Sequence, residues 1–357
     1  MSLKCGIVGL PNVGKSTLFN ALTSSKKAQA ENFPFCTIDP NIGIVSVPDE
    51  RLTKISKISK SAKTINAAIT FVDIAGLVKG ASKGEGLGNK FLSHVREVDT
   101  IIHLTRCFDS EKIQNVNKDV DPVRDLEIIE TEILLSDLES LQKRLEKSNK
   151  KKLENDELNF LEECKKLISD GKKPVGLKKK YSKDLIKKSA LLSLKPRIIV
   201  CNVDEKSLPN GNNYSDACKK KFPNENIIIV CADIEDQIMN LQIKDRKDFM
   251  FESGIKNTGL DNLIKTGYNT LGLSTFFTSG PEESRAWTIE KNSKAEDAAS
   301  VIHTDFKKKF IRAETVTHED FIKYNGFNEC KNAGKLRLEG KDYLVNDGDV
   351  MYFRVGS

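Results

Sequence analysis

One run of residues near the N-terminus limits the possible folds of this chain more than any other: Gly9-Leu-Pro-Asn-Val-Gly-Lys-Ser-Thr17. The run fits the pattern G-x-x-x-x-G-K-[ST] and lies between an apolar stretch, Lys4–Leu10, and a helix-like segment over residues 16–25. Glycines let backbone N–H groups close around phosphates, and the following helix adds the positive end of its dipole. By average residue frequencies, about 1–2% of chains this long contain the bare pattern by chance. The run therefore predicts a phosphate-binding loop between a strand and a helix.

The residues of this loop have distinct expected roles. The Lys15 ammonium can reach the β- and γ-phosphates of a nucleoside triphosphate, which makes Lys15 a catalytic candidate. The Ser16 hydroxyl can coordinate Mg²⁺. We expect direct nucleotide contacts along the segment that comprises Asn12, Val13, Gly14, Lys15, Ser16 and Thr17.

A second motif, Asp73-Ile-Ala-Gly76, follows the apolar segment that ends at Val72. A carboxylate at the end of a strand beside the P-loop strand can hold Mg²⁺ through water, so Asp73 is a predicted metal ligand. The Gly76 N–H can sense a γ-phosphate, which makes Gly76 a catalytic candidate. Upstream, the loop over residues 33–41 offers Thr37 as a second hydroxyl ligand for Mg²⁺; the alternative is a hydroxyl that stabilises a turn.

A third motif concerns the nucleotide base. Guanine-nucleotide switches place N-K-x-D after a late strand, and its aspartate accepts both guanine N–H groups. This chain has Asn202-Val-Asp-Glu205 there, with valine at the lysine position and glutamate at the aspartate position. The mismatch favours adenine. The expected base-side contacts are Asn202, Val203, Ala232 at the end of the last strand, and Phe108 as an apolar platform, although Phe108 could equally be a core residue.

Short apolar segments rich in β-branched residues alternate with helix-like segments. The expected strands are Lys4–Leu10, Gly43–Val47, Ile69–Asp73, Thr100–Leu104, Arg197–Asn202 and Ile227–Ala232. The alternation predicts an α/β fold with a parallel sheet covered by helices. We assign residues 1–125 and 196–273 to this discontinuous P-loop domain. A small α+β module is expected over residues 274–357, from the segments Arg285–Ile289, Lys294–Lys308 and Val350–Val355.

Residues 126–195 interrupt the alternation. Leucines at 134, 138, 141 and 145 recur at helical spacing among charged residues. The polar residues 147–152 indicate a turn. This pattern predicts an inserted helical hairpin of coiled-coil type, with ordinary covering helices as the alternative. Between residues 136 and 188, 16 Lys and Arg stand against 10 Asp and Glu, an excess as large as the net charge of +6 of the whole chain. The asymmetry indicates a polyanionic partner, with a solvated helix face as the commoner alternative.

Composition excludes several classes of protein. With 38% hydrophobic and 30% charged residues, the chain is typical of soluble globular proteins. No apolar run approaches the ~18–20 residues that span a bilayer, and the N-terminus lacks a signal-peptide core, so we expect a cytoplasmic protein without a membrane partner. The eight cysteines are scattered, without the close pairs typical of a zinc site. We therefore expect reduced thiols and leave redox sensing open only for Cys36.

These motifs, with several further segments, resemble the YchF family of Obg-related P-loop NTPases, also called Obg-like ATPases. The resemblance is carried by the P-loop run, by Asn32-Phe-Pro-Phe-Cys-Thr-Ile-Asp-Pro-Asn41, by Asp73-Ile-Ala-Gly-Leu-Val-Lys-Gly-Ala-Ser82, by Gly84-Glu-Gly-Leu-Gly-Asn89, by Asn202-Val-Asp-Glu205 and by Gly348-Asp-Val-Met-Tyr-Phe-Arg354. These segments run across nearly the whole chain. The two switch segments are highly specific.

The resemblance implies a Ras-like P-loop G domain with an inserted antiparallel helical arm and a C-terminal β-grasp module called TGS. It also implies ATP hydrolysis and association with ribosomes, so the expected partners are ATP and the large subunit, with rRNA or tRNA as candidate contacts of the arm and the TGS module. We expect a regulatory switch linked to translation or stress. By position, the resemblance carries nucleotide contacts onto Asn12 through Thr17 and Val203, and Mg²⁺ ligation onto Ser16 and Thr37. Asn12 also resembles the P-loop asparagine of cation-activated relatives, which makes it a catalytic candidate and K⁺ a candidate cofactor beside Mg²⁺.

Two positions differ from the residues expected in the YchF family and in Ras-like enzymes. Asn115 stands where the family is expected to carry a histidine, so a catalytic role at that position is in doubt. Leu77 follows Gly76 where Ras-like enzymes carry the glutamine that orients water, so we expect slow intrinsic hydrolysis. Two alternatives to a ribosome-associated ATPase stay open: a nucleotide-gated ribosome- or RNA-binding module with negligible hydrolysis, and a GTPase of the Obg class.

Overall fold

A computed structural model describes residues 3–24, 41–74, 87–110, 119–148, 154–255 and 257–356. The described chain divides into two compact units. The first contains 3–24, 41–43 and 70–263, and the second contains 44–69 and 264–356. Among the described helices, none combines the length and the apolar character needed to cross a bilayer.

The P-loop sheet has six strands in the order β2-β4-β1-β5-β6-β7. Its strands are β1 (Lys4–Val8), β2 (Ile42–Ser46), β4 (Ala68–Asp73), β5 (Thr100–Arg106), β6 (Arg197–Asn202) and β7 (Asn226–Val230). β1 runs parallel to β4 and β5, β5 to β6, and β6 to β7. All seven residues of β5 are buried, as expected of a strand covered on both faces. The predicted parallel sheet is confirmed for β4, β1, β5, β6 and β7, and each of the six strands lies within one or two residues of its expected bounds. At the edge, the Asp73 N–H donates to the Asn41 carbonyl and the Val47 N–H to the Ala67 carbonyl, so β2 runs antiparallel to β4.

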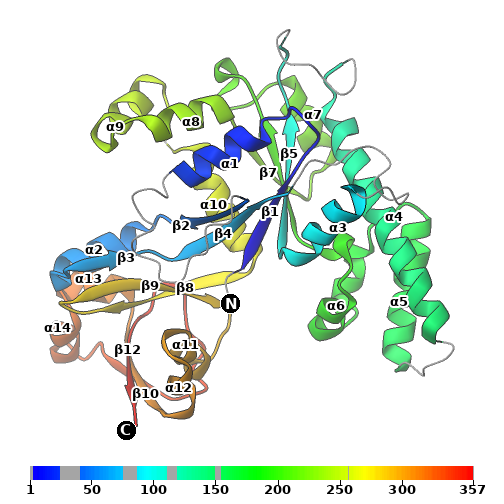
Figure 1. Ribbon diagram of the computed structural model, residues 1–357. Coiled ribbons are helices and arrows are strands. Elements are labelled where there is room, and N and C mark those ends of the chain that lie inside the picture. The colour runs from blue at the N-terminus through cyan, green and yellow to red at the C-terminus, as the bar shows by residue number, and fades with distance from the viewer. Residues whose placement is uncertain are drawn as a thin grey trace. The chain divides into compact units, whose positions relative to one another are not determined.

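Helices cover both faces of this sheet. They are α1 (Lys15–Ser24), α3 (Leu87–Glu97), α7 (Asn213–Lys221), α8 (Ala232–Asn240), α9 (Ile243–Glu252) and α10 (Gly259–Thr270), with a short 3-10 turn η6 (Glu205–Ser207) after β6. α1 and α8 pack together on one face, and α3 and α7 lie on the other (Figure 1). The arrangement places the carboxyl ends of β1, β4, β5, β6 and β7 at one edge of the sheet, where the predicted motifs meet.

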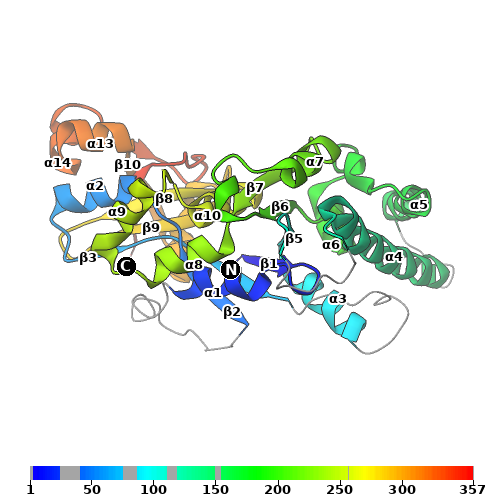
Figure 2. The same cartoon turned by 90° about the horizontal axis from the view of Figure 1, so that it is seen from above.

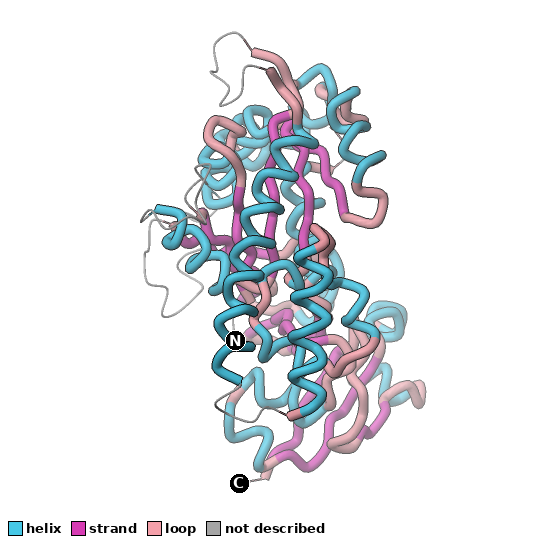
Figure 3. Tube along the Cα trace, turned by 90° about the vertical axis from the view of Figure 1, so that its right-hand side faces the viewer, coloured by secondary structure: helices cyan, strands magenta, loops and turns pink. Residues whose placement is uncertain are grey.

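A helical arm is inserted between β5 and β6. It consists of α4 (Pro122–Ser148), α5 (Asn155–Ser169), η4 (Pro174–Lys179), α6 (Lys183–Ser189) and η5 (Leu192–Leu194). α4 and α5 lie side by side as a hairpin (Figure 3). They bury a shared core that includes Leu134, Leu141, Phe160, Leu161 and Ile168. The expected hairpin is confirmed, although α4 begins four residues before the predicted start at 126.

The second unit contains a mixed sheet in the order β11-β10-β12-β8-β9-β3. Its strands are β3 (Lys63–Ile65), β8 (Leu273–Ser279), β9 (Glu283–Glu290), β10 (Phe310–Val316), β11 (Arg337–Glu339) and β12 (Val350–Val355). Its helices are α2 (Glu50–Ser59), α11 (Ala295–Ile302), α12 (Thr304–Lys308), α13 (His318–Tyr324) and α14 (Phe327–Asn332). α2 lies beside α13 (Figure 2). Phe276, Ala298 and Phe353 belong to the core between the sheet and α11.

Residues 44–69 differ from the predicted domain division, which placed them with the P-loop domain. β3 pairs in parallel with β9, so Lys63 lies opposite Glu283. Arg51 of α2 binds Asp347 at 2.7 Å, and the Ser61 hydroxyl donates to the Gly280 carbonyl at 2.7 Å. These contacts join the segment to residues more than 200 positions later in the chain. Local sequence patterns contain no signal for such pairing.

Candidate nucleotide-binding site

The loop between β1 and α1 has the backbone conformation that its glycines and asparagine suggest. Asn12 has φ of 64° and Gly14 has φ of 94°, both in the left-handed region. A Cβ added to Gly14 would lie 2.4 Å from the side-chain nitrogen of Asn202, so a larger residue is excluded there. The Gly14 carbonyl accepts from the Leu18 N–H at 2.9 Å, which starts the first turn of α1. The loop therefore leads directly into a helix N-terminus, a favourable place for a phosphate group.

Two predicted site residues meet beside this helix start. The ammonium of Lys15 forms an ion pair with the carboxylate of Asp73, and both side chains are less than a fifth exposed. Their approach follows from the sheet, because β1 and β4 are parallel neighbours in which Ile7 lies opposite Asp73. Ser16, in the first turn of α1, is exposed. A hydroxyl and a carboxylate are the hard oxygen ligands that Mg²⁺ prefers, so this donor set fits that ion.

Asn202 connects the P-loop to the last motif. Its side-chain nitrogen donates to the Val13 carbonyl at 3.0 Å, and its side-chain oxygen accepts from the Ala232 N–H at 3.0 Å. Asn202 is only 4% exposed, so both bonds lie away from water. Three predicted nucleotide-binding residues that are distant in sequence are thus held together. Ala232 is also the first residue of α8.

The two residues after Asn202 differ in burial. Val203 is 1% exposed and packs in an apolar cluster with Leu126, so only its backbone is available to a nucleotide. This packing does not support a contact between the Val203 side chain and the base. Asp204 is exposed, and its carboxylate accepts from the Ser207 hydroxyl. Glu205, also exposed, begins η6.

Phe108 lies just beyond β5 and is partly exposed. The guanidinium of the buried Arg106 stacks on its ring at 4.8 Å and also donates to the Phe108 carbonyl at 2.9 Å. Next to it, Asp109 accepts from the Tyr214 hydroxyl at 2.9 Å. The aromatic ring is therefore held in place by a cation, a geometry that suits a platform beside a base.

Comparison with known proteins agrees with this geometry. Residues 4–136 match a family model described as "50S ribosome-binding GTPase", and residues 273–356 match YchF-GTPase_C, described as "Protein of unknown function (DUF933)". "Ribosome-binding ATPase YchF" of Bacillus subtilis is 48% identical over 365 residues, with 99% of each chain covered. The chain belongs to the YchF family. The protein of the same name from Escherichia coli O157:H7 is 46% identical over 365 residues, again with 99% of each covered.

A solved structure of this family has the same fold. The Schizosaccharomyces pombe "YchF GTPase" superposes with a TM-score of 0.89 at 38% identity, covering 99% of this chain and 98% of its own. The expected α/β fold, with a P-loop domain and a C-terminal YchF domain, is confirmed by this match and by the family models.

Four predicted positions of this YchF chain lie outside the described residues. They are Thr37, Gly76, Leu77 and Asn115, and Cys36 lies outside them as well. Their assigned roles stay predictions.

Sequence reasoning missed two polar residues near the site, the partly buried Asn212 and the buried Glu235. Asn212 donates from its side chain to the Cys107 carbonyl at 2.7 Å and also caps α7, which positions the segment before Phe108. Glu235 of α8 accepts from the Gly259 N–H at 2.5 Å, and burial raises its pKa to about 7. An asparagine before a helix-like segment is a recognisable cap signal, whereas nothing around Glu235 indicated burial.

Proposed function

We propose that this protein binds ATP with Mg²⁺ in the cytoplasm, hydrolyses it slowly, and acts on ribosomes as a regulatory switch linked to translation or stress. The relatives at 46–48% identity are named ribosome-binding ATPases, and their match extends over 99% of the chain. Full-length similarity at this level supports transfer of both the ATPase activity and the ribosome association.

The proposed preference for ATP rests on the residues of the loop after β6. Guanine is held by a carboxylate that accepts from two N–H groups of the base, whereas adenine presents N1 as an acceptor. In this loop, the Asp204 carboxylate already accepts from Ser207, and the fourth position carries the longer Glu205. The buried Val203 cannot take the place of the lysine of N-K-x-D. An unmatched polar group at the base costs ~1–3 kcal/mol, or roughly 5–150-fold in affinity.

For the other predicted site residues, the proposed roles follow from their positions in the P-loop and in the Asp73-Ile-Ala-Gly76 motif. Lys15 would contact the β- and γ-phosphates, together with backbone N–H groups at the start of α1. Ser16, Thr37 and Asp73 are the proposed ligands of Mg²⁺, with Asp73 acting through water. When bound, Mg²⁺ would neutralise charge on the phosphates. Gly76 would sense the γ-phosphate through its N–H. Asn12 would help to bind K⁺ as an activating ion.

Slow hydrolysis follows from Leu77. A leucine cannot hydrogen-bond the attacking water, so turnover needs help from a partner or a cation. We expect multiple-turnover ATP hydrolysis by the pure protein to be slow in sodium buffer and faster with ribosomes or K⁺. A rate that stays negligible with ribosomes would favour the alternative, a nucleotide-gated binding module. A fast rate in sodium alone would contradict the assignment of Leu77.

The test of nucleotide choice is a pair of calorimetric titrations with ATP and GTP at equal Mg²⁺. We expect tighter binding of ATP. Equal affinities would indicate a non-selective NTPase. Preference for GTP would overturn the proposal and favour the second candidate, a GTPase, the activity named for the yeast relative. Cosedimentation with ribosomes in the apo, ADP-bound and non-hydrolysable-ATP-bound forms tests the partner.

A further inference from the structure

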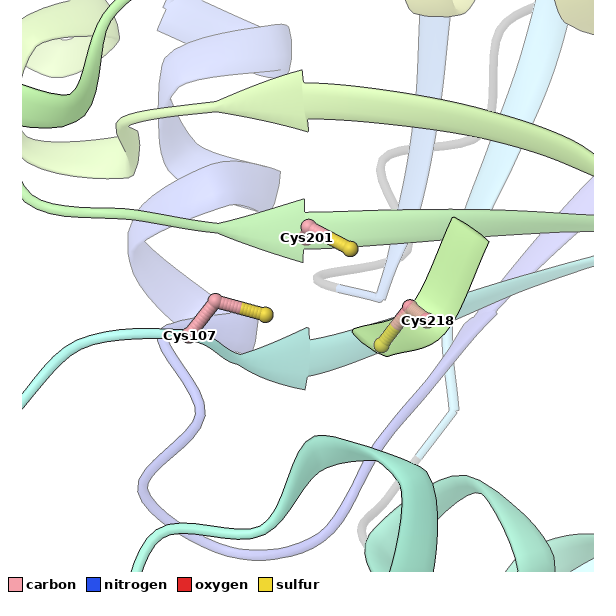
Figure 4. A group of neighbouring side chains, drawn as sticks. All are labelled: Cys107, Cys201 and Cys218. Carbon is pink, nitrogen blue, oxygen red and sulfur yellow. The ribbon is translucent and has the colours of Figure 1, made fainter. Parts of the chain in front are cut away.

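Three cysteines that are far apart in the sequence meet beside the P-loop sheet. Cys107 directly follows β5, Cys201 lies near the end of β6, and Cys218 belongs to α7. Their sulfur atoms all lie within 4.8 Å of one another, and each residue is fully buried. Figure 4 shows the three side chains directed into the space between the strand ends and α7. The spacing of cysteines along the chain gave no sign of such a group, and all three thiols are free, as the sequence predicts.

The cluster is accounted for by the sheet. β5 and β6 are parallel neighbours in which Thr105 lies opposite Cys201, and the Cys107 N–H donates to the Asn202 carbonyl at 2.8 Å. α7 covers this end of the two strands and brings Cys218 over them.

The surroundings contain no competing ligand among the described residues. The three sulfurs lie in an apolar cluster with Leu126, Ile199 and Val203. In the described part of the chain, no histidine, aspartate or glutamate joins the group of mutually close donors. Full burial also leaves no solvent contact from which a water ligand would come. Among the Cys, His, Asp and Glu side chains that the structure describes, the donor set is therefore these three sulfurs.

This donor set selects the ion. Calcium and magnesium require oxygen ligands, and structural zinc sites are almost always four-coordinate. Thiolate ligands without nitrogen or oxygen suit a soft ion, above all Cu⁺. With metal–sulfur bonds of ~2.3 Å, a planar three-sulfur site separates its sulfurs by ~4.0 Å. Sulfurs already within 4.8 Å reach that geometry by a small inward shift.

We propose that Cys107, Cys201 and Cys218 form a site for one Cu⁺ ion, held by three thiolates in a trigonal arrangement. Binding displaces the thiol protons into solvent, and the ion does not change its oxidation state. The site is distinct from the proposed ATPase activity and does not depend on it.

The test starts from the reduced full-length chain with Cys36→Ser, which removes the cysteine outside the described residues. Under anaerobic conditions, Cu⁺ is titrated in competition with bicinchoninate, whose coloured complex reports the copper that the protein leaves behind. We expect one Cu⁺ per chain to be taken from the chelator. Cys107→Ser, Cys201→Ser and Cys218→Ser should each lower the affinity by more than about 100-fold, since loss of a mere hydrogen-bond partner of a ligand already costs 10–100-fold.

Matched controls are Cys164→Ser in α5 and Cys330→Ser in α14, two cysteines that are also buried but lie elsewhere. They should bind Cu⁺ like the parent. Circular dichroism and thermal unfolding check that each variant folds, and alanine replaces serine at any position where serine unfolds the chain. X-ray absorption of the Cu⁺-loaded parent provides a readout that needs no cluster variant: three sulfur neighbours and no nitrogen or oxygen are expected. Retention of copper by the cluster variants, a nitrogen or oxygen ligand, or no uptake by the parent would overturn the proposal.

Discussion

The side chain of Asn202 donates a hydrogen bond to the Val13 carbonyl at 3.0 Å, although the two residues are 189 positions apart. The same amide nitrogen lies where a Cβ on Gly14 would come within 2.4 Å. Its oxygen holds the Ala232 N–H. The conformation of the P-loop and that of the loops on the base side are therefore fixed by one buried amide.

Asn202→Ala should weaken both stability and nucleotide binding. The change leaves the buried Val13 carbonyl and Ala232 N–H without their partner, at a cost of ~1–3 kcal/mol for each group. We expect the free energy of unfolding to fall by about 2–4 kcal/mol and ATP affinity to fall roughly 10–100-fold. Chemical denaturation and calorimetry measure the two effects.

The control is Asn224→Ala, an exposed asparagine in the turn after α7. It should change neither quantity beyond about 0.5 kcal/mol. Asn202→Asp is informative as well, because it keeps an acceptor for Ala232 but points a second carboxylate oxygen at the Val13 carbonyl. Wild-type ATP affinity in Asn202→Ala would show that the bridge does not organise the site.

The local parts of this architecture were predictable from sequence. The P-loop glycines, the strand before them and the helix after them form a continuous pattern, and each parallel strand is an apolar run because both of its faces are covered. The relation between β1 and β4 then follows, so the meeting of Lys15 with Asp73 could be expected. Asn202, too, is a residue that the sequence singles out, and the structure brings it to the P-loop, although its role as a bridge was not foreseen.

Contacts between distant segments were not predictable in the same way. Nothing in residues 63–65 indicates that they pair with β9, since a three-residue strand has almost no periodicity of its own. The predicted helix over 294–308 is interrupted at His303, which has extended backbone and accepts from the Asp305 N–H through its ring. The burial of Val203 and the convergence of Cys107 and Cys218 depend on how α7 and the arm pack, which periodicity does not encode.

Glu235 should make stability fall as pH rises toward neutrality. Burial raises its pKa in the folded chain to about 7 from an ordinary value of 4.5, so between these pH values the folded state holds a proton that the unfolded state has lost. Its contribution is fully present below pH 4.5 and is lost as pH rises through 7. The expected slope is about 1.4 kcal/mol per pH unit at most, or roughly 3 kcal/mol in total.

The measurement is the free energy of unfolding at several pH values between 4.5 and 8, for wild type and Glu235→Gln. Glutamine keeps an acceptor for the Gly259 N–H but does not titrate. The free energy of unfolding of the variant should therefore increase relative to that of wild type as pH rises. Glu252→Gln, at an exposed position in α9, should follow wild type at every pH. Parallel curves for wild type and Glu235→Gln would exclude the role of Glu235.

The arm lysines should act in ribosome binding, but not all in the same way. Lys173 binds Glu130 at 3.2 Å and Glu225 at 3.5 Å, and Lys180 pairs with Glu163, so these two belong to the protein's own ion pairs. The exposed lysines of the arm include Lys147, Lys172 and Lys179. Replacing these three with glutamate should abolish cosedimentation with ribosomes and leave basal ATP turnover unchanged.

Salt dependence distinguishes phosphate contacts from other causes. Each lysine that contacts a phosphate should contribute roughly one unit to the slope of log affinity against log salt, so single variants should each make the slope shallower. Lys244→Glu with Lys247→Glu, two exposed lysines of α9, is the matched control and should cosediment normally. Normal cosedimentation of the arm variant would mean that the charged helices form only a solvated face.

Glu205→Asp should shift nucleotide preference toward GTP. In the wild-type loop the fourth carboxylate extends one methylene too far to accept from both guanine N–H groups, and Asp204 is engaged by the Ser207 hydroxyl. Shortening Glu205 moves the carboxylate toward the position it has in N-K-x-D. We expect the ratio of ATP to GTP affinity to fall roughly tenfold, part of the ~1–3 kcal/mol mismatch. Paired titrations at equal Mg²⁺ measure it, with Asp204→Asn as the control. Full preference for GTP is not expected, because Val203 still occupies the position of the lysine in N-K-x-D. An unchanged ratio of the two affinities would mean that selectivity arises at Phe108 or at the backbone of Ala232 instead.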